Sequence, residues 1–513
     1  MKKSLFVSIA VLSLTACQFA ELEDQAESAS TTQPVIVTPE NSNTISINKE
    51  SDIFVVDSAT SSLTLTGNLE GKTIYYAAVN TTNRVISNEY VRYVASGNAR
   101  SAASYASIIE EEESAEDEFN TTSGMDFFPE FESSSSRAAG DSSGSEVKKL
   151  ALNNGVTTKK IFVSTSSNAY EKKTATLYAF NEICNVWVIN DDPFLNTAAK
   201  RSEIASTYAQ KFALVYPMIH KIFGKESDFL YSSVRGDKQH MNEVNDTGSK
   251  VNIVIYDLYN DGNDSNHGGT LGLFSSMDYY KNGLAFSNVT VSRSNEGKFF
   301  YIDSYFATTL LDYTVSTLAH EFQHMINFSV KAMNGKASDS NFNEMLSMLC
   351  EDLMQDVLKV DDAYSPKNRI RKFLESYYKA GIREYDSTLQ SYANAYAFGA
   401  WLIRNYGGSA LVKEMMSNGK ANNDCIASAV NSINGSSYSF NDLIQEFVKA
   451  CFNQKFYSPR IFENNQITDI ASSYGIFLKN YGRVAKGENS VTLNFASESG
   501  KTSSGLLMYV YVK

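Results

Sequence analysis

The hydrophobic positions between residues 150 and 304 fall in short runs, and most of these runs predict β-strands. They are rich in β-branched and aromatic residues and are bounded by Ser, Asn, Asp and Gly, which is typical of strands. The runs are KKIFVSTS, TATLYAFNEICNVWVIN at 174–190, VNIVIYDL at 251–258 and FFYIDS at 299–304. At 195–223 the spacing becomes that of a helix, with Ile204 and Tyr208 on one stripe, and Gly224 predicts its end.

From 310 to about 452, hydrophobic residues recur at three- and four-residue steps almost throughout, as they do in amphipathic helices. The pattern therefore predicts a strand-rich lobe followed by a helical lobe. This is an α+β arrangement, and the cleft between two such lobes is a common place for a binding site.

Further strands are expected near both ends of the chain. IFVVDS at 53–58, SLTLTGN at 62–68 and TIYYAAVN at 73–80 predict a small all-β domain over residues 35–97. VTLNFAS and LLMYVYVK alternate in the same way and predict C-terminal strands within 481–513.

The composition changes sharply between residues 98 and 147. Four consecutive glutamates stand at 110–113, four serines at 133–136, and Gly and Ser dominate the remainder. Such a segment cannot bury enough apolar surface to fold, so it predicts a disordered acidic linker. We interpret the acidic run as a solvated spacer, although such runs can also bind a metal or a basic partner.

The first residues predict export. Lys2 and Lys3 precede an apolar run from 5 to 16, which is typical of a signal peptide and too short to span a bilayer. The run ends in Leu-Thr-Ala-Cys, which resembles the bacterial lipobox. That resemblance implies cleavage before Cys17 and lipid attachment to its thiol, which would anchor the protein to a membrane. An ordinary cleaved signal followed by an incidental cysteine is the alternative.

The expected location is therefore that of an exported bacterial lipoprotein, at the periplasmic face of the outer membrane or on the cell surface. The predicted organisation has six parts. These are a signal peptide at 1–16, a lipid-anchored tether at 17–34, the β-domain at 35–97, the linker at 98–147, a main domain at 148–480 and the C-terminal strands at 481–513.

Composition narrows the function. With 513 residues, 43% of them hydrophobic, the chain can bury a sizeable core. Its net charge of −13 argues against a nucleic-acid partner, which requires a basic face. After Cys17 four cysteines remain, widely spaced and without a CxxC pair, so no cysteine zinc site is expected. No oligomeric state is predicted.

The strongest chemical signal is HEFQH at 320–324, in a chain with only five histidines. On a helix, His320 and His324 lie one turn apart on the same face, so both imidazoles can reach one zinc ion at roughly 2.0 to 2.1 Å. Glu321 can then lie beside the open coordination position. The pattern predicts a catalytic Zn²⁺ site.

A catalytic zinc ion needs a third protein ligand. A histidine six residues after His324 would serve, but that position is Val330. A carboxylate on the following helix is the other route. Glu344, in SNFNEMLSMLCED, is twenty positions after His324 and is our candidate.

An ordered set of motifs resembles a known family. NEICNVWV, VNIVIYDL, GGTLGLFSSMDYY, HEFQHMINF, NEMLSMLCED and YANAYAFGAWLIRNYGG together resemble the hyicolysin-like neutral metallopeptidases, which belong with thermolysin among the gluzincins. The resemblance covers roughly residues 150–410. It implies a gluzincin-type catalytic domain and a zinc-dependent endopeptidase acting on protein or peptide substrates. It also implies that His320, His324 and Glu344 are the ligands and that Glu321 is the general base.

Two positions depart from the thermolysin pattern. Such enzymes have an aspartate four residues after the ligand glutamate, where this chain has Met348, and Glu351 is our candidate to support a ligand histidine instead. They also use a downstream histidine as oxyanion donor, and this chain has none after His324. We expect a tyrosine in that role, Tyr396 in preference to Tyr392, although aromatic residues one helical turn apart often only pack in a core.

Other functions stay open at this point. The chain could be a surface lipoprotein that binds other molecules through its β-domain and whose peptidase lobe is degenerate. The zinc ion could be structural, although such sites usually have four protein ligands rich in cysteine. An active enzyme could also process its own linker between 98 and 147.

Overall fold

The computed structural model describes residues 35–37, 44–48, 52–56, 62–80, 120–123, 157–166, 169–244, 248–262, 270–287, 289–377, 381–383, 385, 389–452, 476–484, 486–494 and 506–512. The expected signal peptide at 1–16, Cys17 and the tether at 17–34 lie outside these residues. So does the expected linker at 98–147, apart from residues 120–123.

A seven-stranded sheet forms the strand-rich part of the molecule. Its strands are β6 (Asn120–Ser123), β7 (Thr158–Ser166), β8 (Ala169–Phe180), β9 (Cys184–Ile189), β12 (Val251–Tyr256), β13 (Thr270–Phe274) and β14 (Phe299–Asp303), in the order β6-β13-β14-β12-β9-β8-β7. The central β14, β12 and β9 are parallel, whereas β13 and β8 border them in antiparallel fashion.

The central strands are buried on both faces, which explains their continuous hydrophobic runs. Every residue of β9, β12 and β14 is buried. Along β12, Ile253 and Ile255 join the core on one face of the sheet, while Val254 and Tyr256 join the core on the other face. The strands predicted at 251–258 and 299–304 are thus confirmed.

Helix α2 (Ala198–Phe223) connects β9 to the parallel strand β12 and packs against β8, β9 and α4. The Thr197 side chain caps its first turn by accepting a hydrogen bond from the Lys200 amide. The helix ends at Gly224, whose φ of 97° is easily reached only by glycine. The helix predicted at 195–223 is confirmed.

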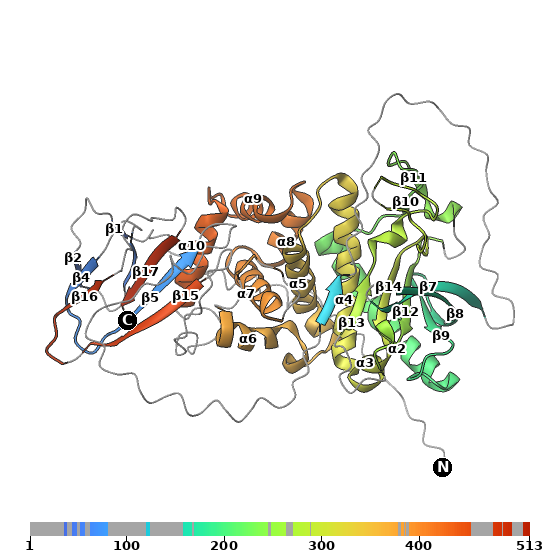
Figure 1. The fold of residues 1–513 in the computed structure, drawn as a ribbon, viewed down its shortest axis with the longest axis horizontal. Helices are drawn as coiled ribbons and strands as arrows, with labels where there is room; N and C mark the ends of the chain where they lie inside the picture. Colours follow the sequence, from blue (N-terminus) through green and yellow to red (C-terminus); the bar gives the residue numbers. More distant parts are fainter. Residues whose placement is uncertain are drawn as a thin grey trace, which may run out of the picture.

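The helical part of the chain follows the sheet. It contains α3 (Ser304–Thr309), α4 (Leu311–Val330), α5 (Ser340–Leu358), α6 (Arg369–Ser376), α7 (Leu389–Asn405), α8 (Gly408–Ser417), α9 (Asn422–Asn434) and α10 (Phe440–Phe452). Helix α4 packs against β13 and β14 on one side and against α5 on the other (Figure 1). The result is a mixed α and β fold in which α4 lies where the sheet meets the helices.

Helices α5 and α7 approach closely at a glycine. A Cβ atom added to Gly399 of α7 would lie 2.7 Å from Cγ of Met345 on α5. The close approach brings the tyrosines of α7 beside the helix that carries Glu344.

The strands near the two chain ends pair with one another. They are β1 (Val35–Val37), β2 (Thr44–Ile47), β3 (Asp52–Val56), β4 (Ser62–Gly67), β5 (Thr73–Asn80), β15 (Ile476–Arg483), β16 (Ser490–Asn494) and β17 (Leu506–Val512). They form a five-stranded sheet ordered β1-β3-β17-β5-β15 and a three-stranded sheet ordered β16-β4-β2. Strand β17 therefore lies between β3 and β5. The domain boundaries themselves stay a prediction.

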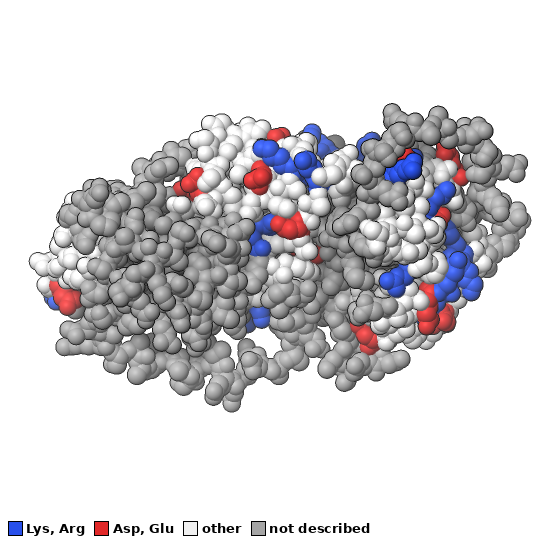
Figure 2. Space-filling model, turned by 45° about the horizontal axis from the view of Figure 1, so that its top comes forward, with Lys and Arg blue, Asp and Glu red and all other residues white. Residues whose placement is uncertain are grey.

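A short hairpin, β10 (Phe229–Tyr231) with β11 (Lys238–His240), completes the strands of the described residues. Within those residues, no helix combines the length and the apolar character needed to cross a bilayer. In Figure 2, basic side chains gather at the end of the molecule where Figure 1 has β7 and β8, with acidic ones below them.

Candidate metal centre

Helix α4 carries the HEFQH motif through the interior of the protein. Because the sheet covers one side of the helix and α5 the other, polar as well as apolar positions are buried. His320 and Glu321 are 0% exposed and His324 is 1% exposed. The two imidazoles lie on the same face with their ring centroids 4.7 Å apart.

Glu344 of α5 meets both histidines. Its Oε2 is 3.1 Å from Nε2 of His320, and its Oε1 is 3.6 Å from Nε2 of His324. One ligand atom from each of the three residues lies within 4.8 Å of the others. Two imidazole nitrogens and a carboxylate oxygen form the donor set of many catalytic zinc sites.

Glu351 holds the outer nitrogen of His320. Its Oε1 is 2.7 Å from Nδ1 of His320, and its Oε2 accepts a hydrogen bond of 2.7 Å from Oγ of Ser316. Nδ1 therefore faces a carboxylate while Nε2 faces Glu344. This contact agrees with the support expected from Glu351, and the apolar Met348 is buried at the position where an aspartate would stand in thermolysin-like enzymes.

His324 is oriented by a hydroxyl that sequence reasoning missed. Oγ of Ser347 lies 3.0 Å from Nδ1 of His324 and donates a hydrogen bond of 2.5 Å to Oε1 of Gln323. Nδ1 of His324 is thus the donor, which leaves Nε2 as the atom with a free lone pair. The signal was present, because Ser347 comes three residues after Glu344 and so lies on the same face of α5.

The electrostatics of the cluster favour a cation. Burial alone would lower the pKa of His320, but the hydrogen bonds that its ring donates to Glu344 and Glu351, together with their charges, raise it to about 10. Burial lowers the pKa of His324 to about 4. The two carboxylates around His320 thus stabilise a positive charge at this place. The neutral His324 has a lone pair that can bind a cation there.

The environment of Glu321 also favours a bound cation. Among the residues that the structure describes, neither oxygen of its buried carboxylate makes a hydrogen bond of normal geometry, and the nearest backbone donor is the amide of Phe274. Burial raises the pKa of this carboxyl well above its usual range. An unpartnered buried carboxylate is costly, and a cation with its water beside the carboxylate would offset that cost. The residues present therefore fit a zinc ion.

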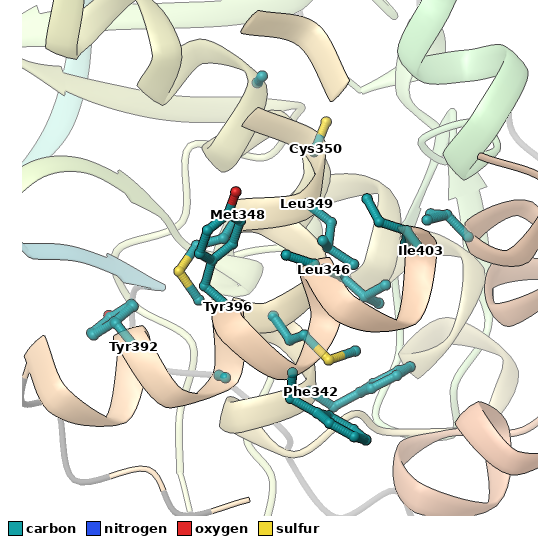
Figure 3. Packing of buried hydrophobic residues seen from close by; sticks show 14 of the residues in the cluster. Phe342, Leu346, Met348, Leu349, Cys350, Tyr392, Tyr396 and Ile403 are labelled. Carbon is teal, nitrogen blue, oxygen red and sulfur yellow. The ribbon is translucent and has the colours of Figure 1, made fainter. Parts of the chain in front are cut away.

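The two tyrosines expected as oxyanion donors have different partners. Figure 3 shows Tyr396 beside Met348 of α5, with Tyr392 one turn earlier on α7. The Tyr396 hydroxyl donates a hydrogen bond of 3.0 Å to Oδ2 of Asp352, and that carboxylate also pairs with Arg404 at 2.9 Å.

The Tyr392 hydroxyl is 3.1 Å from the Tyr385 hydroxyl. Burial raises the pKa of Tyr392 well above its usual value, and the charge of Glu344 raises it further. The electrostatics thus couple Tyr392 to the cluster. Tyr385 belongs to no helix or strand, and no motif in the sequence points to it.

Two comparisons with known proteins bear on this centre. The sequence profile of the family described as Peptidase M30 matches residues 165–458, more than half of the chain. The chain is also similar to the Neutral metalloprotease ShpI of Staphylococcus hyicus, with 25% identity over 279 residues, which are 52% of this chain and 56% of that protein. The chain thus spans about half the length of the curated relative that it matches.

Proposed function

The chain belongs to the peptidase M30 family, and from this membership we propose that it hydrolyses peptide bonds with a zinc ion held by His320, His324 and Glu344. The membership confirms the resemblance predicted from the motifs. The observation that carries the proposal is the buried cluster of two imidazoles and one carboxylate next to a second buried carboxylate, Glu321, whose oxygens make no hydrogen bond of normal geometry within the described part of the chain.

The proposed chemistry divides between the metal and Glu321. When bound, zinc would lower the pKa of a water molecule towards about 7 and polarise the substrate carbonyl. Glu321 acts as general base: it takes the proton of the attacking water and delivers it to the leaving amine. Glu351 and Ser347 keep the outer nitrogens of the two histidines hydrogen-bonded, so that both Nε2 atoms stay directed at Glu344.

A tyrosine would stabilise the oxyanion. Against the preference for Tyr396 drawn from the sequence, we favour Tyr392, because the Tyr396 hydroxyl donates to the Asp352 carboxylate. The Tyr392 hydroxyl instead meets another hydroxyl, that of Tyr385, and feels the charge of Glu344. Tyr385 then orients the Tyr392 hydroxyl. A donor of this kind is commonly worth about 3 kcal/mol.

The substrates proposed are proteins or peptides, and the enzyme is proposed to act on a membrane surface as a lipoprotein. The sequence up to Cys17 supports that location. Labelling with a radioactive fatty acid tests it: the full-length protein should take up label and Cys17→Ala should not. Equal labelling of both would contradict the anchor.

The decisive experiment uses the soluble form that begins at residue 18. We expect it to cleave an unfolded protein such as casein, to lose activity with a chelator and to regain it with zinc. Glu321→Gln should keep one zinc per chain, measured by atomic absorption, yet fail to cleave. Glu182→Gln, which changes an exposed glutamate, is the matched control and should be fully active.

The contrary outcome is equally informative. Zinc bound at one per chain, with no cleavage of any protein or peptide tried, would contradict the peptidase and leave the non-catalytic binding lipoprotein. Cleavage by metal-loaded Glu321→Gln at the wild-type rate would overturn the role of Glu321.

A further inference from the structure

One edge of the seven-stranded sheet runs beside the proposed metal centre. Strand β13 pairs with β14 on its inner side and packs against α4. A Cβ atom added to Gly272 would lie 2.8 Å from Cγ of Glu321. The backbone of β13 at Gly272 therefore packs directly against the proposed general base.

Without β6, the sheet would end in β13 on one side and in β7 on the other, and these two edges differ in chemistry. At the far edge, β7 carries Lys159 and Lys160, and charged side chains on an edge strand discourage further pairing. Strand β13 reads TLGLF, has no charged residue and is buried throughout. Such an edge is suited to pairing with another extended chain.

A segment of the same chain occupies this edge. Strand β6 (Asn120–Ser123) runs parallel to β13 and pairs with it over Thr270 to Phe274. In Figure 1 it is the cyan strand beside β13 and α4. It comes from the stretch that the sequence predicts to be a linker, so the structure has a strand at four positions where disorder was expected. The two threonines favour this conformation.

We propose that residues 120–123 are an internal occupant of the peptide-binding edge and compete there with substrates. The inference rests on the proposed function. Extended peptides add to a sheet edge mainly through backbone hydrogen bonds. The outward N–H and C=O groups of β13 cannot serve β6 and a substrate together, so substrate must displace β6.

The occupant is suited to displacement. Four residues make few backbone bonds, but β6 and β13 belong to the same chain, so their pairing is intramolecular, and such pairings commonly have effective concentrations in the millimolar range. If the edge were free in about one molecule in ten, the KM for a peptide would be about tenfold higher than for an open edge, at unchanged kcat.

The test removes the pairing through the backbone. In Thr121→Pro/Thr122→Pro, one of the two lost N–H groups faces β13, because adjacent amides of a strand point in opposite directions. Ser134→Pro/Ser135→Pro, in the serine run of the same stretch, is the matched control. Both are made in the soluble form that begins at residue 18, with all four remaining cysteines and the metal retained.

The first readout does not need activity. In the Glu321→Gln background, hydrogen–deuterium exchange of those amides within 270–274 that face β6 should rise about tenfold with the threonine-to-proline pair and stay unchanged with the control, while the amides bonded to β14 keep their protection. Unchanged exchange in both would overturn the docking of β6, whatever the enzyme does.

The second readout is kinetic. With Glu321 present, the threonine-to-proline pair should lower the KM for a short peptide up to tenfold and leave kcat unchanged. Faster exchange with an unchanged KM in an active enzyme would overturn the competition while the proposed function stands. Faster exchange without activity in any form would overturn the proposed function and the competition together, and only the docking would remain.

Discussion

At the scale of single residues, the centre is built largely from spacings within two helices. His320 and His324 are one turn apart on α4, and Glu344, Ser347 and Glu351 lie at steps of three and four on α5. Such spacings can be read from a sequence, so the placement of the two histidines and Glu321 on one helix could be predicted. Glu351 could be proposed as the support of a histidine because Met348 stands where thermolysin-like enzymes have an aspartate in that role.

Which of the two tyrosines would act as the proposed oxyanion donor was harder to predict. Tyr392 and Tyr396 have the same residue type and lie one turn apart, so the pattern alone does not separate them. Their partners depend on where α7 packs against α5 and on Tyr385, which belongs to no helix or strand. Contacts between distant segments of this kind leave no local signature.

The two tyrosines give a matched pair of variants. Tyr392→Phe should lower kcat about 100-fold with little change in zinc content, because it removes a donor to the developing oxyanion. Tyr396→Phe should lower kcat less than tenfold, since it breaks the bond to Asp352 instead. Single-turnover kinetics on one peptide measure both, and the reverse order would show that Tyr396 is the donor.

At the scale of elements, the sequence pattern predicts strands that are buried on both faces but not the short strand at the edge of the sheet. Strands β9, β12 and β14 were predictable because burial on both faces demands continuous apolar runs. Strand β6 reads NTTS, and only its pairing with β13, which is distant in the sequence, makes it a strand. No local pattern distinguishes these four residues from the rest of the stretch 98–147, which the sequence predicts to be a linker.

The contact between β13 and α4 makes Gly272 a sensitive position. In Gly272→Ala, the new methyl group would lie 2.5 Å from Cγ2 of Thr317 and 2.8 Å from Oε1 of Glu321, so Glu321, the proposed general base, must move. A displacement of this size commonly costs about 100-fold in turnover. We expect that loss in kcat, with zinc content unchanged because no ligand is touched.

The control for this variant is Gly283→Ala, whose added Cβ meets no atom within 4 Å. Its φ of +88° disfavours alanine, so it reports the effect of modest backbone strain without a clash near the site. Equal kcat in Gly272→Ala and the wild type would show that β13 does not constrain Glu321.

At the scale of the whole molecule, a buried network of polar side chains links α2 to the start of β14, close to α4. Glu226 accepts hydrogen bonds from Tyr216 at 3.0 Å and from Lys298 at 3.1 Å, and its Oε2 is 2.6 Å from Nε2 of His220. Lys298 also bonds Asp228. Burial would raise the pKa of Glu226, but His220 and Lys298 lower it to about 2.

Because the pKa of Glu226 is lower in the folded state than in the unfolded chain, its stabilising contribution is complete above about pH 4.5 and is lost as the pH falls towards 2. The contribution is on the order of 3 kcal/mol. Glu226→Gln should therefore lower the free energy of unfolding at pH 7 and converge with the wild type near pH 2. Urea titrations across this range measure the difference.

The exposed Glu203→Gln on α2 serves as the control and should follow the wild type at every pH. A constant difference between Glu226→Gln and the wild type from pH 7 to pH 2 would contradict the ionised state of Glu226.

The position of β17 between β3 and β5 has a consequence for how the chain can be divided. Topologically, the seven-stranded sheet and the helices that follow it are an insertion into a host β unit whose halves are separated by about four hundred residues. A fragment that starts at 148 and keeps the C-terminus would carry β15, β16 and β17 without the strands they pair with. Unpaired edges of this kind promote aggregation. Expressed pieces should therefore keep both halves of the host or omit both, and loss of either half would leave the strands of the other half unpaired.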